Sequence, residues 1–271
     1  RGSVAVGELE VIVDRFAARR EALEQRIQKL VTAEFTRFDG WYSPKLVEEI
    51  TQAVAARVSI AQAGTATLTD AYLSRVTTYV TGTYVAGASV PQVMGKSLRM
   101  GVAGHEEVYG RVVSEYRYQR SVGADERQAL STALARAQSM VSTDMGLAFQ
   151  HQTKRFTEVR NINRFRRVVR PELSKGGACG LCVGASDRLY RRGDLMPMHA
   201  RCKCTVIAVT SKSDPGSQLN DDTLSELYTQ AGSTAGADLK KVRVTVEQHG
   251  ELGPQLRVQG QNFRGPAEVA A

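Results

Sequence analysis

The stretch from Cys179 to Cys204 reads CGLCVGASDRLYRRGDLMPMHARCKC and contains all four cysteines of the 271-residue chain. One of the four histidines, His199, lies in the same stretch. The spacing is C-x2-C, then sixteen residues, then H-x2-C-x-C. Zinc in proteins is commonly held by four cysteine or histidine ligands at the corners of a tetrahedron, and closely spaced ligand pairs are typical of such sites. The sequence therefore predicts one zinc ion in this stretch.

Five side chains are candidates for four ligand positions: Cys179, Cys182, His199, Cys202 and Cys204. The set without Cys204 is our first choice. If the segment is extended, however, Cys204 shares a face with Cys202 and could replace Cys202 or His199. Free thiols and two disulfides are the alternatives, and a long chain with all its cysteines in one patch is unlike a disulfide scaffold. A surplus of ligands and the lack of an H-E-x-x-H motif favour a closed structural site over a catalytic one.

Basic residues are concentrated around the same stretch. Between residues 151 and 204 there are 13 Lys and Arg against four acids, an excess of +9, whereas the net charge of the whole chain is +8. One interpretation is sequence-independent contact with the phosphates of double-stranded DNA, and the other is a solvated strand face. The candidate contacts are Lys154, Arg155, Arg160, Arg164, Arg166, Arg167 and Arg170.

The first half of the chain has the apolar periodicity of helices. We expect helices over residues 7–38, 44–63, 67–80, 106–120 and 124–150. Ser43 and Pro44 are a typical N-cap and first helical residue, and Gly64 is expected to end the helix that they begin. These helices form either a compact bundle or an extended arm.

The second half has the shorter, β-branched runs of strands. We expect strands over residues 156–169, 205–210, 242–246 and 255–259, a short helix over 223–230, and a turn over 250–254. The predicted fold class is α+β, with a helical N-terminal half (1–150), a small zinc-stabilised β-rich C-terminal domain (151–265) and a loose tail (266–271). The chain starts at Arg1 and not at a methionine, which indicates that a preceding segment was cleaved or left out.

No catalytic motif stands out. Gly95-Lys96-Ser97 resembles the end of a phosphate-binding loop, but the glycine needed five residues earlier is Val90. His105-Glu106 lacks the second histidine of a zinc protease. We expect no enzymatic activity, no small-molecule substrate and no membrane span, since no apolar run approaches the roughly 20 residues that a bilayer requires.

The run MPMHARCKCTVIAV, together with the upstream C-x2-C, resembles the C-terminal domain of phage Mu F-like (MuF) minor head proteins. The matching positions are Pro197, His199, Cys202 and Cys204, followed by a strand. The segment VTVEQHGELGPQLRVQGQNF is similar to a strand–turn–strand segment of such proteins from phages of actinobacterial hosts. The resemblance covers residues 149–265, and the helical first half carries no matching motif.

This resemblance implies a minor capsid protein inside the virion near the portal, acting in head morphogenesis and in DNA packaging or ejection. Its partners would be the portal protein and the major capsid protein, and it would reside in the host cytoplasm before assembly. One alternative is a zinc-containing, non-specific DNA-binding module. It is disfavoured because a strand follows Cys204 where a zinc finger would place its helix. A second, weaker alternative is a capsid maturation protease.

Overall fold

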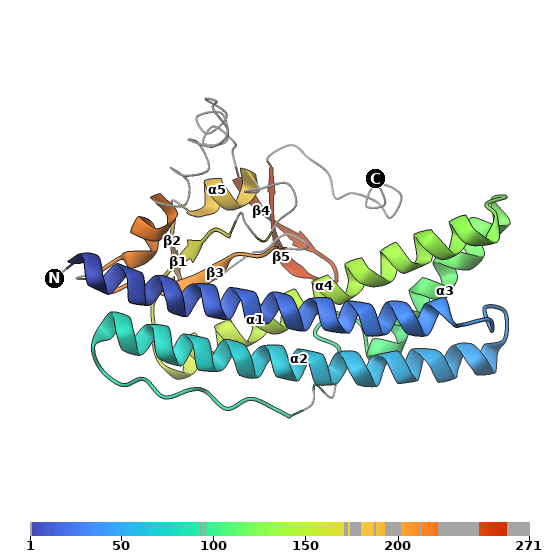
Figure 1. Cartoon of the computed structure of the whole chain (residues 1–271), viewed down its shortest axis with the longest axis horizontal. Helices are drawn as coiled ribbons and strands as arrows, with labels where there is room; N and C mark the ends of the chain where they lie inside the picture. The colour runs from blue at the N-terminus through green and yellow to red at the C-terminus, as the bar shows by residue number, and fades with distance from the viewer. Residues whose placement is uncertain are drawn as a thin grey trace.

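The computed structural model describes residues 2–92, 94, 96–170, 173, 180–186, 188–192, 202–211, 213–221 and 244–258. Four helices form an elongated body, and a small three-stranded sheet and a hairpin pack beside it (Figure 1). The fold class is α+β, as the sequence predicts.

The first two helices, α1 (Gly2–Thr36) and α2 (Pro44–Thr81), lie side by side and run in opposite directions (Figure 1). Ser43 caps α2, because its hydroxyl accepts a hydrogen bond from the backbone N–H of Leu46, and Pro44 occupies the first turn. Gly82 ends the helix with a φ of 70°, a left-handed conformation that glycine adopts without strain. The predicted start of α2 is therefore confirmed.

The prediction that Gly64 ends the second helix is wrong, because α2 continues without a break to Thr81. Glycine inside a helix costs about 1 kcal/mol relative to alanine. Val58, Leu73 and Val76 are buried on either side of Gly64, and burying one such side chain stabilises by about 1.5–3 kcal/mol. Packing on the neighbouring helices therefore outweighs the local preference of one residue.

The next two helices, α3 (His105–Ser121) and α4 (Glu126–Val159), form a second pair. Asp125 caps α4 by accepting a hydrogen bond from the backbone N–H of Gln128 at 2.8 Å. Since α4 runs through residue 150, the domain boundary suggested by the sequence falls inside a helix. Residues 156–159 were predicted as strand, and this is wrong. Phe149, Thr153 and Phe156 are buried at helical spacing, so the helical pattern continues past the boundary.

The sheet has the order β2-β1-β3, with all neighbours antiparallel. Its strands are β1 (Arg164–Val168), β2 (Leu189–Arg191) and β3 (Thr205–Ala208), and the short helix α5 (Gly180–Ser186) lies between β1 and β2 in the sequence. Phe165 of β1 pairs with Tyr190 on one side and with Ala208 on the other. Four of the five residues of β1 are buried, as expected for a central strand.

The predicted C-terminal hairpin is confirmed, with β4 (Val244–His249) paired antiparallel to β5 (Gly253–Val258). Gly253 has a φ of 69°, which explains why the turn ends in glycine. Residues 215–221 are helical. The helix predicted over 223–230 and the tail 266–271 lie outside the described residues.

Two hydrophobic cores lie along the body. One lies between the helices alone and includes Val54, Val108 and Met145, with Trp41 stacked on Tyr116 at 4.0 Å. The other joins the helices to the sheet, and it includes residues of α1, α2, α4, α5 and β3. The first, second and fourth helices thus belong to both cores, so the helical and β-rich parts share one packed body. Within the described residues, no helix is long and apolar enough to cross a membrane.

Candidate metal centre

Cys182, Cys202 and Cys204, here called the cysteine triad, converge where α5 meets the segment that enters β3. Their Sγ atoms all lie within 4.8 Å of one another, and those of Cys182 and Cys202 are 3.7 Å apart. The three side chains are 4%, 5% and 2% exposed, respectively. No disulfide forms among these described cysteines.

The spacing of the sulfurs suits a tetrahedral metal ion. Zinc–sulfur bonds of about 2.3 Å at tetrahedral angles place two sulfurs about 3.8 Å apart. The distance between Cys182 and Cys202 is close to this value. The buried triad could therefore hold a metal ion such as zinc, with one coordination position left for a fourth ligand.

Cys179 and His199, the other two candidate ligands, lie outside the described residues. Their part in the site stays a prediction. The structure adds a finding on Cys204, which our first choice of four ligands omitted. Its sulfur lies beside those of Cys182 and Cys202, so the triad by itself would supply three of four ligands.

The protonation of Cys204 is coupled to metal binding. Contact with Cys182 lowers the pKa of the Cys204 thiol, whereas contact with Cys202 and burial raise it, and the net shift is upward. Without a cation, this thiol would thus stay protonated at neutral pH. Metal ligation requires thiolates, so binding a metal here would release protons into solution.

Two buried arginines lie beside the triad. Arg167 of β1 is fully buried, 5.8 Å from the centre of the Tyr190 ring. Burial disfavours its charged form, but the nearby sulfurs of the triad, when they are ionised, raise the pKa of Arg167 above its usual value. Arg20 of α1 is 4% exposed and donates to the backbone carbonyls of Cys204 at 3.1 Å and Cys202 at 2.8 Å.

These arginines suit a metal–thiolate centre electrostatically. A dication with three thiolates carries one net negative charge, and with four thiolates it carries two. Burying such charge is costly unless opposite charge lies nearby. The sequence predicts nucleic-acid contact for Arg167 and no role for Arg20. Helical periodicity distinguishes Arg20 from its exposed neighbour Arg19, because Arg20 shares the apolar face of α1 with Phe16 and Ile27, but it does not indicate which groups Arg20 contacts.

The predicted basic strand face is not present. Arg166 is 8% exposed; its Nε donates to the carboxylate of Asp214 at 2.8 Å and its Nη1 donates to the carbonyl of Ser186 at 3.0 Å. Arg166 is therefore not exposed for the predicted nucleic-acid contact, because β1 is the central strand and four of its five residues are buried. Arg167 is buried as well.

The other candidates for nucleic-acid contact differ in exposure. Lys154, Arg155 and Arg164 are exposed. Arg160 and Arg170 are half-buried, and they donate to the carbonyl of Gly87 and to the carboxylate of Asp14, respectively. The basic side chains between residues 151 and 204 thus differ in role: some make structural contacts and others face solvent.

A second buried polar group lies between α3 and α4. Asp144 accepts hydrogen bonds from Arg99 at 2.8 Å and from the hydroxyl of Tyr109 at 2.9 Å. Burial and the neighbouring Asp144 carboxylate raise the pKa of Tyr109. Arg99 also lies 3.6 Å from Glu251 in the turn of the β4–β5 hairpin. This network ties the hairpin to the helices.

Comparisons with family models, curated proteins and solved structures find no match to this chain. Its function is therefore inferred from its own residues.

Proposed function

We propose that this chain is a non-catalytic structural protein of a phage head, of the Mu F-like minor head type, and that its cysteine triad holds one structural zinc ion. The observation that carries the metal part is the convergence of three buried sulfurs at the spacing of zinc ligands. The head-protein part is supported by the resemblance at Pro197, His199, Cys202 and Cys204.

The surroundings of the triad support a structural ion. A catalytic zinc keeps one position open to water or substrate. Here every described ligand is at most 5% exposed, and the carbonyls of Cys202 and Cys204 are held by Arg20. Zinc suits the site better than magnesium or calcium, because those ions prefer oxygen ligands and the triad offers only sulfur.

The long helices support a role in assembly. α1 and α2 have 35 and 38 residues, so each is about 50–57 Å long at ~1.5 Å per residue. Rods of this length offer extended faces to the portal and the major capsid protein. In this proposal, the zinc centre fastens the β-rich part to the middle of α1, at Arg20, inside the virion. After Cys204 the chain enters β3, where a zinc finger would have its recognition helix.

Metal analysis of the purified chain tests the zinc part. We expect one zinc per chain in the wild type and a large loss of zinc in Cys202→Ser and Cys204→Ser. The matched control is Val183→Ala, which shortens a fully buried side chain of α5 without removing a ligand and should keep the metal. Wild-type protein prepared without chelators that contains no zinc would refute the centre. Zinc retained in both serine variants would refute the ligand assignment.

Mass spectrometry of purified phage particles tests the head-protein part. The experiment requires the phage whose genome encodes this chain, and antibody labelling of opened and intact heads would then place the chain. We expect a few copies per particle, accessible only in opened heads. Absence of the chain from particles would refute the virion role while leaving the zinc centre intact.

A further inference from the structure

From Asp14 onward, the acidic residues of α1 all pair with other side chains of the chain. Asp14 accepts from Arg170, and Glu34 pairs with Arg57 of α2 at 2.6 Å. Glu21 and Glu24 both pair with Lys203, at 2.6 Å and 2.9 Å. The negative charge of α1 from Asp14 onward is thus neutralised within the molecule, whereas Glu8 and Glu10 near its N-terminus are exposed.

The cations of α1 are arranged differently. Arg20 is buried. The other basic residues of α1, and Arg37 directly after its end, are exposed; together they are Arg15, Arg19, Arg26, Lys29 and Arg37. In the part of the chain that the structure describes, none of these five side chains forms an ion pair or a hydrogen bond. Their positive charge is therefore directed to solvent.

These five residues form one line, here called the basic stripe. At about 100° per residue, all five fall within an arc of roughly 80° of the helix circumference. From Arg15 to Arg37 the stripe extends over about 33 Å at 1.5 Å per residue. The small side chains of Ala18, Ala22 and Ala33 lie between the cations. The stripe thus has no large apolar side chain at its middle.

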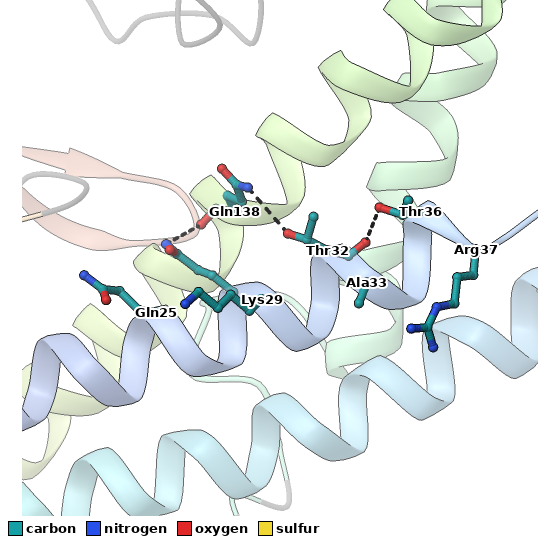
Figure 2. A pocket seen from close by; sticks show the side chains of 8 residues that line it. Gln25, Lys29, Thr32, Ala33, Thr36, Arg37 and Gln138 are labelled. Atoms are coloured by element: carbon teal, nitrogen blue, oxygen red, sulfur yellow. Dashed lines mark hydrogen bonds between the residues drawn. The ribbon is translucent and has the colours of Figure 1, made fainter.

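Both ends of the basic stripe adjoin grooves. Near the C-terminal end, Lys29 and Arg37 line an open groove between α1 and α4 with uncharged polar side chains, shown in Figure 2. These are Gln25, Gln28, Thr32, Thr36 and Gln138. At the other end, Arg15 and Arg19 share a groove with the exposed Arg75 of α2 and with Glu8, and the remaining lining of this groove is mostly apolar.

We propose that the basic stripe binds the phosphate backbone of double-stranded DNA without reading its sequence. A duplex presents one phosphate charge per about 1.7 Å, so phosphates are available wherever the five cations lie along it. Glutamine and threonine side chains also commonly contact phosphate oxygens, which suits the groove of Figure 2. An acidic protein partner is disfavoured, because protein interfaces centre on buried aromatic or apolar anchors and the middle of the stripe has none.

This surface is separate from the basic strand that the sequence suggested, since β1 is buried and α1 carries the exposed charge. It does not depend on the zinc centre or on the proposed role in the phage head.

Fluorescence anisotropy with a 30-base-pair duplex at several salt concentrations tests the proposal on the full, zinc-loaded chain. The test variant combines Arg15→Gln, Arg19→Gln and Arg26→Gln. The slope of log K against log salt should become shallower by about two to three units, at close to 0.9 per lost phosphate contact. The control combines Arg127→Gln, Arg188→Gln and Arg191→Gln, which removes equal charge from exposed positions elsewhere and should leave the slope within about half a unit.

Circular dichroism melts of both triple variants confirm folding, which these exposed side chains should not affect. An unchanged slope in the stripe variant would overturn the proposal, as would equal slope changes in both variants. Poly-glutamate is the second probe. Tighter binding of poly-glutamate than of DNA at equal charge concentration would also overturn it and indicate an acidic protein partner.

Discussion

The guanidinium of Arg20 donates to the backbone carbonyl of Cys202 at 2.8 Å, although the two residues are 182 positions apart in the sequence. The same guanidinium lies 4.4 Å from the centre of the Phe149 ring on α4. One side chain of α1 therefore links the ligand segment of the metal centre to two helices. The β-rich part is attached to the helical body through its candidate metal site.

Replacing Arg20 by methionine tests this link. Methionine keeps much of the packing, but the carbonyls of Cys202 and Cys204 lose their donor while they stay buried. We expect the free energy of unfolding to fall by about 2–4 kcal/mol. Denaturant unfolding of the zinc-loaded protein measures it. Arg19→Met, at the exposed neighbouring position, should change stability by less than about 0.5 kcal/mol. Equal losses in the two variants would contradict the assigned role of Arg20.

Removal of the metal should loosen more than the ligand segment. The sequence alone suggests that the effect is confined to residues 170–210. In the structure, Cys182, Cys202 and Cys204 pack in one core with Phe16 and Tyr72. We expect hydrogen exchange after chelation to speed up in β1, β3 and the adjoining turns of α1 and α2. The distal core around Trp41 should keep its protection. Exchange that changes only in the ligand segment would show that the two parts are energetically independent.

Arg166 should matter for stability and not for DNA binding. Arg166→Ser leaves the half-buried carboxylate of Asp214 and the carbonyl of Ser186 without this donor, and should cost about 1–3 kcal/mol of unfolding free energy. Arg164→Ser is the matched control on the same strand, and its exposed side chain should contribute less than about 0.5 kcal/mol. If the salt slope of DNA binding falls in Arg166→Ser while stability is kept, the buried assignment is refuted.

His105 should make the protein less stable in mild acid. It is 5% exposed, and within the described residues neither ring nitrogen has a hydrogen-bond partner. Burial lowers its pKa, and the nearby acids Asp144 and Glu106 only partly oppose this, while Arg99 lowers it further. Because the unfolded state then binds the proton more readily, stability should fall as pH drops below about 6.5, by up to about 1.4 kcal/mol per pH unit.

The measurement compares unfolding free energies of wild type and His105→Gln, both zinc-loaded, between pH 7.5 and pH 5.5. The difference between the two profiles isolates His105, because the cysteines and the other acids are common to both proteins. The variant should show the shallower decline. Parallel profiles would mean that His105 keeps the same protonation in the folded and unfolded states.

The sequence by itself determined the features that depend on neighbouring residues. Ser43 and Pro44 start α2, Gly82 is present where it ends, and the alternation at 244–258 predicts the hairpin, because caps and periodicity act over a few residues. The spacing of the cysteines likewise indicated a metal site before any geometry was known. These signals predict the α+β class and place the candidate centre in the segment where Cys182, Cys202 and Cys204 converge.

Only the tertiary structure determined which contacts the basic side chains make and which of them face solvent. Arg20 and Arg19 are adjacent, yet Arg20 donates to the carbonyls of Cys202 and Cys204, whereas Arg19 faces solvent. Arg166 and Arg167 belong to the most basic part of the sequence, residues 151–204, yet both are buried, because β1 is the central strand of the sheet. Gly64 stays helical since its neighbours are packed on both sides. In each case the deciding energy comes from burial and from partners distant in the sequence, and such contacts exist only once the chain has folded.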